Sequence, residues 1–120
     1  MNYTVKFHQV IDLPEIDIDV SLPPRRRFED KKKASRAFLK ENLSTEGGVY
    51  FLIEDGIVIY AGRSINLQNR VRTHLANAYL ASRVDSVAVQ FIDDVPTQSI
   101  IEAIAIKEFM PELNVTGKTV

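Results

Sequence analysis

Two short runs of hydrophobic residues in the middle of the chain have the composition of β-strands. Val49–Ile53 and Ile57–Ala61 are rich in β-branched and aromatic residues, and Glu54-Asp55-Gly56 separates them. An Asp-Gly step between two such runs is typical of a β-hairpin. Val87–Phe91, where apolar residues alternate with smaller or polar ones, predicts a third strand. We therefore expect the hairpin to lie within a small sheet.

Three longer segments have the composition or spacing of helices. Glu29 to about Leu43 is rich in helix formers, with only a weak apolar side. The segment from about Ile65 to Leu80 carries an apolar stripe at helical spacing, and Ser64 is placed to cap its N-terminus. The segment from about Gln98 to Met110 is apolar nearly all round and is stopped by Pro111. This order of elements predicts an α+β fold with an at least partly antiparallel sheet.

The first 46 residues do not continue this pattern. Alternation over Tyr3–Val10 predicts a strand, and Ile16–Val20 predicts a short second one. Pro23-Pro24 breaks the chain before the first helix, and the polar segment Ser44–Gly48 links that helix to the hairpin. We therefore expect an N-terminal extension over residues 1–46 and a core over residues 47–120.

Length and composition restrict the class of protein. The chain has 120 residues and a mass of 13.6 kDa, enough for one domain. Hydrophobic residues at 45% and charged residues at 26% are the balance of a soluble globular protein. The absence of cysteine excludes disulfide scaffolds, thiol nucleophiles and cysteine-held metal sites. Without a membrane-length apolar run or a secretory pattern, we expect a cytoplasmic protein with no membrane partner, nucleoid-associated in a bacterium or phage.

Positive charge is concentrated in two blocks, although the net charge is only −1. Residues 25–40 contain eight Lys or Arg against two acids, and Gly56–Val84 contains four Arg and no acid. Such blocks indicate a surface that binds a polyanion. A solvated helix face would give the same pattern, and composition alone does not separate the two interpretations.

Tyr50 and Tyr60 lie one on each arm of the predicted hairpin, and their relative facing depends on the loop. A two-residue turn at Asp55-Gly56 would send the two side chains to opposite faces of the sheet. A three-residue loop with Gly56 in the left-handed conformation would place them directly opposite each other. We expect the three-residue loop if the tyrosines act together, although strand tyrosines more often simply pack on a sheet surface.

A guanidinium and an imidazole share one side of the second predicted helix. Arg70 and His74 are four residues apart, and Arg63 would lie on the same line if the helical path extended back to it. A guanidinium matches phosphate oxygens, and an imidazole exchanges a proton near neutral pH. Together they predict a site that grips a phosphodiester, although such residues are more often ordinary surface residues.

An acid and an amide stand out in the last part of the chain. Glu102, on an almost wholly apolar helix, must be paired, protonated or bound to a cation. A single carboxylate suits a Mg²⁺ ion that keeps most of its waters. Alternatively, Ser99 and Glu102 form a capping box at the helix N-terminus. Asn114 follows Pro111 and is placed to hold backbone groups through its amide.

The order of these residues resembles the motifs of the GIY-YIG nuclease domain. The tyrosines stand in Gly48-Val49-Tyr50 and Tyr60-Ala61-Gly62, both conservative departures from the motif, and are followed by Arg70, His74, Glu102 and Asn114. The resemblance spans about Gly48 to Val115. Within the family, this segment is similar to the incision domain of bacterial excision-repair nucleases and to small phage-type homing nucleases. It implies a small three-stranded antiparallel sheet flanked by helices, to which residues 1–46 add a strand and a helix.

The resemblance implies a metal-dependent endonuclease that hydrolyses DNA phosphodiester bonds with one Mg²⁺ or Mn²⁺ ion. Glu102 would hold the metal, and Arg70 would neutralise charge on the phosphate. Tyr50 or Tyr60 would act as the general base or position the attacking water. His74 would hydrogen-bond one of these tyrosines or relay its proton.

Further expectations concern DNA contacts and partners. Arg63 would be an auxiliary phosphate contact and Asn114 a structural brace. The positive block suggests that the extension follows the DNA backbone through six side chains, those of Arg25, Arg26, Arg27, Lys31, Lys32 and Lys33. An extension that only packs on the sheet edge is equally compatible. The alternatives to an enzyme are a non-catalytic nucleic-acid-binding module and an interaction subunit. The expected partners are DNA and either a second copy of the chain or a larger DNA-processing complex.

Overall fold

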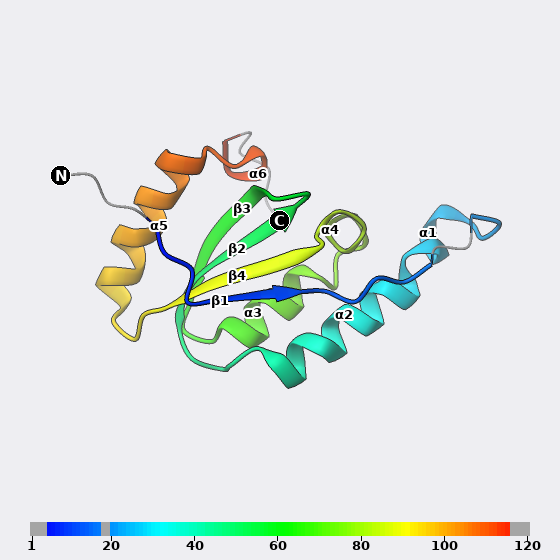
Figure 1. The fold of residues 1–120 in the computed structure, drawn as a ribbon, viewed down its shortest axis with the longest axis horizontal. Helices are drawn as coiled ribbons and strands as arrows, with labels where there is room; N and C mark the ends of the chain where they lie inside the picture. Colours follow the sequence, from blue (N-terminus) through cyan, green and yellow to red (C-terminus); the bar gives the residue numbers. More distant parts are fainter. Residues whose placement is uncertain (1–4, 18–19, 116–120) are drawn as a thin grey trace.

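The computed structural model describes residues 5–17 and 20–115 and contains one antiparallel sheet of four strands. The strands are β1 (Gln9–Asp12), β2 (Gly48–Glu54), β3 (Ile57–Ser64) and β4 (Ser86–Phe91). Their spatial order is β1-β4-β2-β3, so β3 forms one edge of the sheet (Figure 1). The predicted α+β class, antiparallel hairpin and third strand are therefore confirmed.

The expected count of three strands is wrong, because the N-terminal extension contributes the fourth. β1 pairs with β4, from Gln9 opposite Val89 to Asp12 opposite Ser86. This strand overlaps the predicted one, Tyr3–Val10, only at its end; Tyr3 and Thr4 lie outside the described residues. Phe7, one of the apolar residues of the predicted strand, instead packs on the sheet, with its ring centroid 4.8 Å from that of Phe51. In the predicted second strand, Ile16 and Asp17 are not in a strand, and Ile18 and Asp19 lie outside the described residues.

The described residues form six helices, and helices lie against both faces of the sheet (Figure 1). Helices α2, α3 and α4 lie on one face, and α5 lies on the other. The helix bounds are α1 (Pro24–Arg27), α2 (Glu29–Asn42), α3 (Leu67–His74), α4 (Ala78–Arg83), α5 (Val95–Phe109) and α6 (Glu112–Val115). In the described part of the chain, no helix combines the length and apolar character needed to cross a membrane.

Asparagine caps divide the predicted helix of residues 65–80 into α3 and α4. The Asn66 side chain accepts a hydrogen bond from the Asn69 N–H at the start of α3. The Asn77 side chain accepts from the N–H groups of Tyr79 and Leu80 at the start of α4. An asparagine competes with the helix for backbone hydrogen bonds and so favours a new N-terminus over continuation. The predicted cap at Ser64 is wrong, because this residue ends β3.

Helix α5 begins three residues earlier than predicted. The Asp94 side chain accepts a hydrogen bond from the Thr97 N–H, and Pro96 lies in the first turn. Proline, which lacks a backbone N–H, is tolerated there because the N–H groups of the first turn have no partner within the helix. With the N-terminus at Val95, Glu102 lies in the interior of the helix, so the alternative capping box with Ser99 is wrong.

The hydrophobic core has two parts, one on each face of the sheet. The α3-side core contains Tyr50, Leu52, Leu67, Val71 and Val87, and the α5-side core contains Val49, Phe51, Ala88, Ile101 and Ala105. Four extension residues also belong to the α3-side core: Ile11, Leu13, Leu39 and Leu43. The predicted extension and the predicted core thus share one hydrophobic interior.

The hairpin turn has two residues, so the three-residue loop is wrong. Asp55 and Gly56 both have positive φ, at 50° and 77°, and Glu54 pairs with Ile57. The register then shifts, so that Leu52 pairs with Tyr60 and Tyr50 pairs with Gly62. One extra β3 residue, a β-bulge at Ile59, accounts for the shift. The bulge returns the two tyrosines to one face, which the two-residue turn alone would not do.

Candidate active site

Two tyrosines and a histidine converge on the α3 side of the sheet. Tyr50 comes from β2, Tyr60 from β3 and His74 from the last turn of α3. The ring centroids are 6.0 Å apart for the two tyrosines, 5.4 Å for Tyr50 and His74, and 5.1 Å for Tyr60 and His74. The Tyr50 hydroxyl and the His74 Nε2 share a buried hydrogen bond of 2.5 Å. Tyr50 is 1% exposed and Tyr60 is half-buried, so Tyr60 is the more accessible phenol.

Gly62 provides the space in which the Tyr50 phenol lies. A Cβ atom on Gly62 would be 2.5 Å from the Tyr50 hydroxyl oxygen and 2.6 Å from the adjacent ring carbon. Both distances are far shorter than a van der Waals contact, and neither the strand nor the packed ring can easily move away. The glycine of Tyr60-Ala61-Gly62 is therefore required by the tyrosine of the other motif.

Burial keeps the Tyr50 and His74 pair uncharged. Burial, together with the nearby Tyr60 phenol, raises the pKa of Tyr50 well above its usual value, although Arg70 opposes the shift through a hydrogen bond and its charge. Burial and the positive charge of Arg70 lower the pKa of His74 to about 4. Near neutral pH, a neutral phenol thus faces a neutral imidazole that has one unprotonated nitrogen.

Arg70 lies on the accessible side of this group. Its side chain is exposed on α3, one turn before His74. Its charge acts on both Tyr50 and His74. The guanidinium is therefore close to the two rings and open to an anion from solvent.

Glu102 approaches the sheet from the α5 side and meets Arg63. The carboxylate lies 4.0 Å from the Arg63 Nε, with 28% of the Glu102 side chain exposed. Burial raises the pKa of Glu102, while the charge of Arg63 and a hydrogen bond from its backbone act in the opposite direction. Arg63 is on β3 rather than on the line of Arg70 and His74 along the helix, so that expectation is wrong.

Glu102 and Asn114 both contact the backbone of β3 at the edge of the sheet. The Asn114 side-chain amide accepts from the Ala61 N–H at 2.8 Å and donates to the Ala61 carbonyl at 3.0 Å. Two residues along the same edge, the Arg63 backbone bonds the Glu102 carboxylate. Gly62, which holds the Tyr50 phenol, lies between these two positions. The acid and the Tyr50 phenol thus contact adjacent residues of one edge strand, Arg63 and Gly62.

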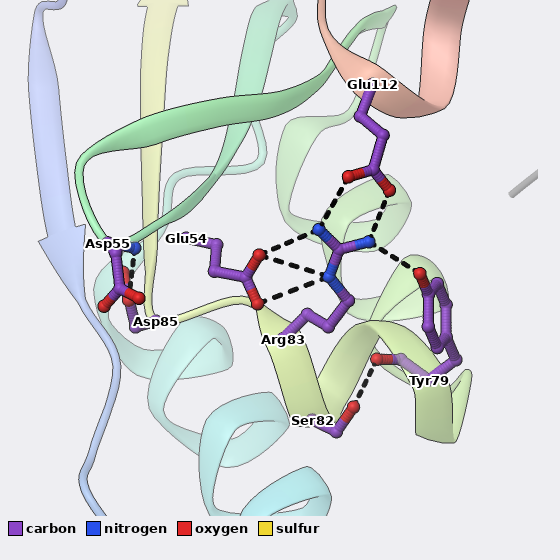
Figure 2. Close-up of polar contacts among 7 residues, drawn as sticks. All are labelled: Glu54, Asp55, Tyr79, Ser82, Arg83, Asp85 and Glu112. Carbon is purple, nitrogen blue, oxygen red and sulfur yellow. Dashed lines mark hydrogen bonds and ion pairs between the residues drawn. The ribbon is translucent and has the colours of Figure 1, made fainter. Parts of the chain in front are cut away.

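Arg83 holds helix α6, which carries Asn114, against the rest of the molecule (Figure 2). Its guanidinium donates to the Glu54 carboxylate at 2.8 Å, to the Glu112 carboxylate at 2.6 Å and to the Tyr79 hydroxyl at 2.6 Å. These partners come from β2, α6 and α4. The hydrogen bonds to both carboxylates and to the phenol raise the pKa of Arg83, which stays charged.

Several basic side chains of residues 25–40 bond within the chain. Arg27 donates to the Leu22 carbonyl at 2.8 Å, Lys31 donates to the Val84 carbonyl at 3.2 Å, and Lys32 pairs with Glu29 at 3.2 Å. Arg26 and Lys33 are exposed, and the Arg25 side chain lies outside the described part of the structure. None of the contacts described for Arg27, Lys31 and Lys32 is with the aromatic group.

Gln98 is a buried polar residue that no sequence motif marks as part of the site. It lies one turn before Glu102 on α5, is 1% exposed, and donates through Nε2 to the Ile92 carbonyl at 2.6 Å. A Cβ on Gly47 would be 2.8 Å from the same nitrogen. The i, i+4 spacing of two polar residues on an apolar helix was the available signal.

Glu102 fits a single divalent cation better than a full protein cage. Among the described residues, no group of three His, Cys, Asp or Glu side chains could hold a metal ion together. A half-buried lone carboxylate on an apolar helix suits Mg²⁺ or Mn²⁺, which keeps most of its water ligands. The donor set therefore agrees with one ion held mainly by Glu102.

Known proteins with similar sequences share one name. No protein-family model matches the chain. UvrABC system protein C from Pelodictyon phaeoclathratiforme is 38% identical over 115 residues, covering 86% of this chain and 17% of the relative. The protein of that name from Caldicellulosiruptor saccharolyticus is 35% identical over 82 residues, covering 62% and 14%. The chain thus spans less than a fifth of the length of these relatives.

Solved structures give the same result and cover a whole domain. The GIY-YIG N-terminal endonuclease domain of UvrC from Thermotoga maritima, bound to magnesium as its catalytic divalent cation, is 27% identical with a TM-score of 0.55. The match covers 70% of this chain and 94% of that domain. A point mutant of the same domain, also bound to its catalytic divalent cation, matches with the same identity and TM-score. This chain is thus similar to the GIY-YIG endonuclease domain of UvrC in fold, in sequence and in the order of the candidate site residues.

Proposed function

We propose that this chain is a metal-dependent endonuclease that hydrolyses phosphodiester bonds in DNA. The observation that carries the proposal is the neutral pair of Tyr50 and His74, whose phenol lies against Gly62. The next residue of that strand, Arg63, bonds Glu102 through its backbone. A packing role alone does not require a buried phenol bonded to an imidazole, an open guanidinium beside them and an acid at the same strand. The magnesium-bound UvrC domain supports the same function.

The two tyrosines receive different roles from their exposure. Tyr60 is half-buried and can contact a water molecule, whereas Tyr50 is almost fully buried. We assign Tyr60 to the attacking water, either as its base or as the group that orients it. With its proton on Nδ1, His74 accepts from the Tyr50 hydroxyl at Nε2, and this pair holds the Tyr60 phenol in position.

The charged residues would act on the phosphate. Arg70 would neutralise the charge that develops on the phosphoryl oxygens, because its guanidinium is open to solvent beside the tyrosines. Glu102 would hold one Mg²⁺ or Mn²⁺ ion, which supplies Lewis-acid stabilisation of the leaving oxygen when bound. Arg63, exposed next to Glu102, would add a phosphate contact, and Asn114 would keep the edge strand in place.

Plasmid nicking tests this function. We expect the chain to nick supercoiled plasmid in Mg²⁺ and Glu102→Gln to abolish nicking, because the amide loses the charge that holds a cation. Glu108→Gln is the matched control, since Glu108 is an exposed acid on the same helix. DNA binding without nicking by the parent, in Mg²⁺ and in Mn²⁺, would instead support a non-catalytic binding module.

A role as one subunit of a larger assembly is the second candidate. The chain covers only 14–17% of relatives whose name assigns them to a UvrABC system. Recognition of a DNA structure would then come from other polypeptides or from a second copy of the chain. Plasmid nicking that requires a partner protein, with the same loss in Glu102→Gln, would support this candidate.

A further inference from the structure

Two arginines from different helices are bonded to each other's backbones. The Arg36 Nε on α2 donates to the Arg72 carbonyl at 3.1 Å, and the Arg72 Nε on α3 donates to the Arg36 carbonyl at 3.0 Å. Both side chains are half-buried. This reciprocal arrangement fixes two guanidinium groups side by side where the extension meets the core.

The arginine pair has no acidic partner in the described structure. The ion pairs found among the described residues join Lys32 to Glu29, Arg63 to Glu102, and Arg83 to both Glu54 and Glu112. Like charges repel, so a fixed pair of cations without a nearby carboxylate favours an anion from outside. The hydrogen bonds described for these arginines use only Nε, which leaves the Nη groups as donors for such an anion.

An exposed polar strip connects this pair to the candidate active site. Successive residues of a helix are 100° apart, so Thr73, Asn69 and then Arg72 follow Arg70 around the outer side of α3. Asn69, Arg70 and Thr73 are exposed, while Val71 and His74 face the core. The whole segment Gly56–Val84 contains no acid. A nucleic acid strand that crosses α3 would therefore meet no negative charge from this helix.

We propose that Arg36 and Arg72 form a clamp for a DNA backbone phosphate next to the scissile site. The inference rests on the proposed nuclease function and names how its substrate is held. A guanidinium matches phosphate oxygens with two parallel donors, and the two fixed forks present such donors from both helices. Contacts of this kind position a duplex without reading its sequence. The clamp also explains why the extension packs against α3.

The salt dependence of DNA binding tests the clamp. Binding of a short duplex is measured in Mg²⁺ at several KCl concentrations, with Glu102→Gln present in every protein so that no DNA is cut. Arg36→Gln with Arg72→Gln should weaken binding and reduce the magnitude of the slope of log K against log salt by about 0.9, the value for one phosphate that is no longer neutralised. Lys6→Gln with Lys107→Gln removes the same charge from exposed residues near α5 and should leave the slope unchanged.

A charge-conserving variant separates phosphate contact from helix bracing. Arg36→Lys with Arg72→Lys keeps both positive charges but loses the Nε–H donors to the carbonyls. Recovery of most of the slope supports the clamp, and thermal melting shows that each variant is folded. An unchanged slope in folded Arg36→Gln with Arg72→Gln, or a Lys variant that matches the Gln variant, would overturn it. Plasmid nicking by the chain without any substitution is measured separately. Failure of the proposed nuclease function is therefore distinguishable from failure of the clamp.

Discussion

Gly62 determines whether the Tyr50 phenol can occupy its place in the candidate site. The position needs a residue without a side chain for steric reasons, since the phenol lies where a Cβ would be. Gly56, by contrast, needs glycine for its backbone conformation, with φ at +77° and no atom within 4 Å of its absent Cβ. Two glycines of one hairpin thus serve two physical purposes.

Replacing these two glycines should separate the two purposes. Gly62→Ala should displace the Tyr50 ring, lower stability by about 1–3 kcal/mol through overpacking and abolish nicking. Gly56→Ala should cost about 1 kcal/mol through backbone strain and leave nicking intact. Urea unfolding and plasmid nicking of both variants test this expectation. Full activity in Gly62→Ala would show that Tyr50 does not need its observed position.

His74 should make folding stability depend on pH. Its pKa is about 4 in the folded protein against 6.5 for an ordinary histidine, so between these values the unfolded state binds more protons. The stability is therefore fully present above pH 6.5 and falls as the pH drops towards 4. Between pH 7 and pH 5 the chain should lose about 2 kcal/mol more than His74→Gln, which removes the titrating group. Equal losses in the two proteins, measured by urea unfolding, would contradict a buried neutral imidazole.

Candidate site residues could be named from the sequence, but contacts between segments could not. Tyr50, Tyr60, Arg70, His74, Glu102 and Asn114 follow from the order of the motifs. The pairing of Arg63 with Glu102 could not be predicted, because it depends on how α5 lies against β3. The roles of Gly62 and Gln98 also depend on contacts made by segments far apart in the chain.

At the scale of elements, helix α6 depends on Arg83 for its position. This short helix, Glu112–Val115, is anchored by the Glu112 carboxylate on Arg83 and by the Asn114 amide on Ala61. Arg83 is only 18% exposed, so its bonds to two carboxylates are partly shielded from solvent. The cluster and the edge strand therefore hold α6 from two sides.

Removing the guanidinium should loosen α6 and weaken the site indirectly. Arg83→Gln should lower stability by about 2 kcal/mol, because Glu54 and Glu112 lose their shared cationic partner. Nicking should also fall, since Asn114 would hold Ala61 less firmly. Tyr79→Phe is the control, because it deletes one hydrogen bond to Arg83 and leaves both carboxylates paired. A stable, fully active Arg83→Gln protein would rule out this anchoring role.

The types of most elements were predictable, whereas their ends were set by local capping. Composition and apolar spacing together identified the hairpin, β4 and the regions that form α2, α3 and α5. The break at Asn77 was not anticipated, because the apolar positions continue from α3 into α4 and hide the second cap. The hairpin register depended on the bulge at Ile59, which no composition signal marked.

At the scale of the whole molecule, the extension and the remaining chain share one hydrophobic core, so we expect them to unfold as one cooperative unit. β1 extends the sheet, and Leu39 of α2 is fully buried with core residues of α3. The basic character of residues 25–40 suggested an extension that follows the DNA backbone or packs on the sheet edge, and Arg36 and Lys31 bond to residues of the core. Packing of this kind is not visible in composition, because half-buried basic residues have the same sequence signature as solvated ones.

A single substitution in the extension should therefore destabilise the entire chain. Leu39→Ala should lower the free energy of unfolding by about 2–5 kcal/mol, as expected for a buried leucine. The neighbouring Lys40→Ala, at an exposed position of the same helix, should change it by less than about 0.5 kcal/mol. Urea unfolding should show one transition in both variants. A separate early transition in Leu39→Ala would mean that residues 1–46 unfold independently.

The extra residue in β3 makes the lengths of the hairpin's loop and arm interdependent. A homologue whose loop gained one residue would keep its tyrosines on a common face only by losing the bulge at Ile59. Insertions and deletions at these two places should therefore occur as compensating pairs during divergence. An uncompensated length change would separate the two phenols even though every side chain of the site was retained.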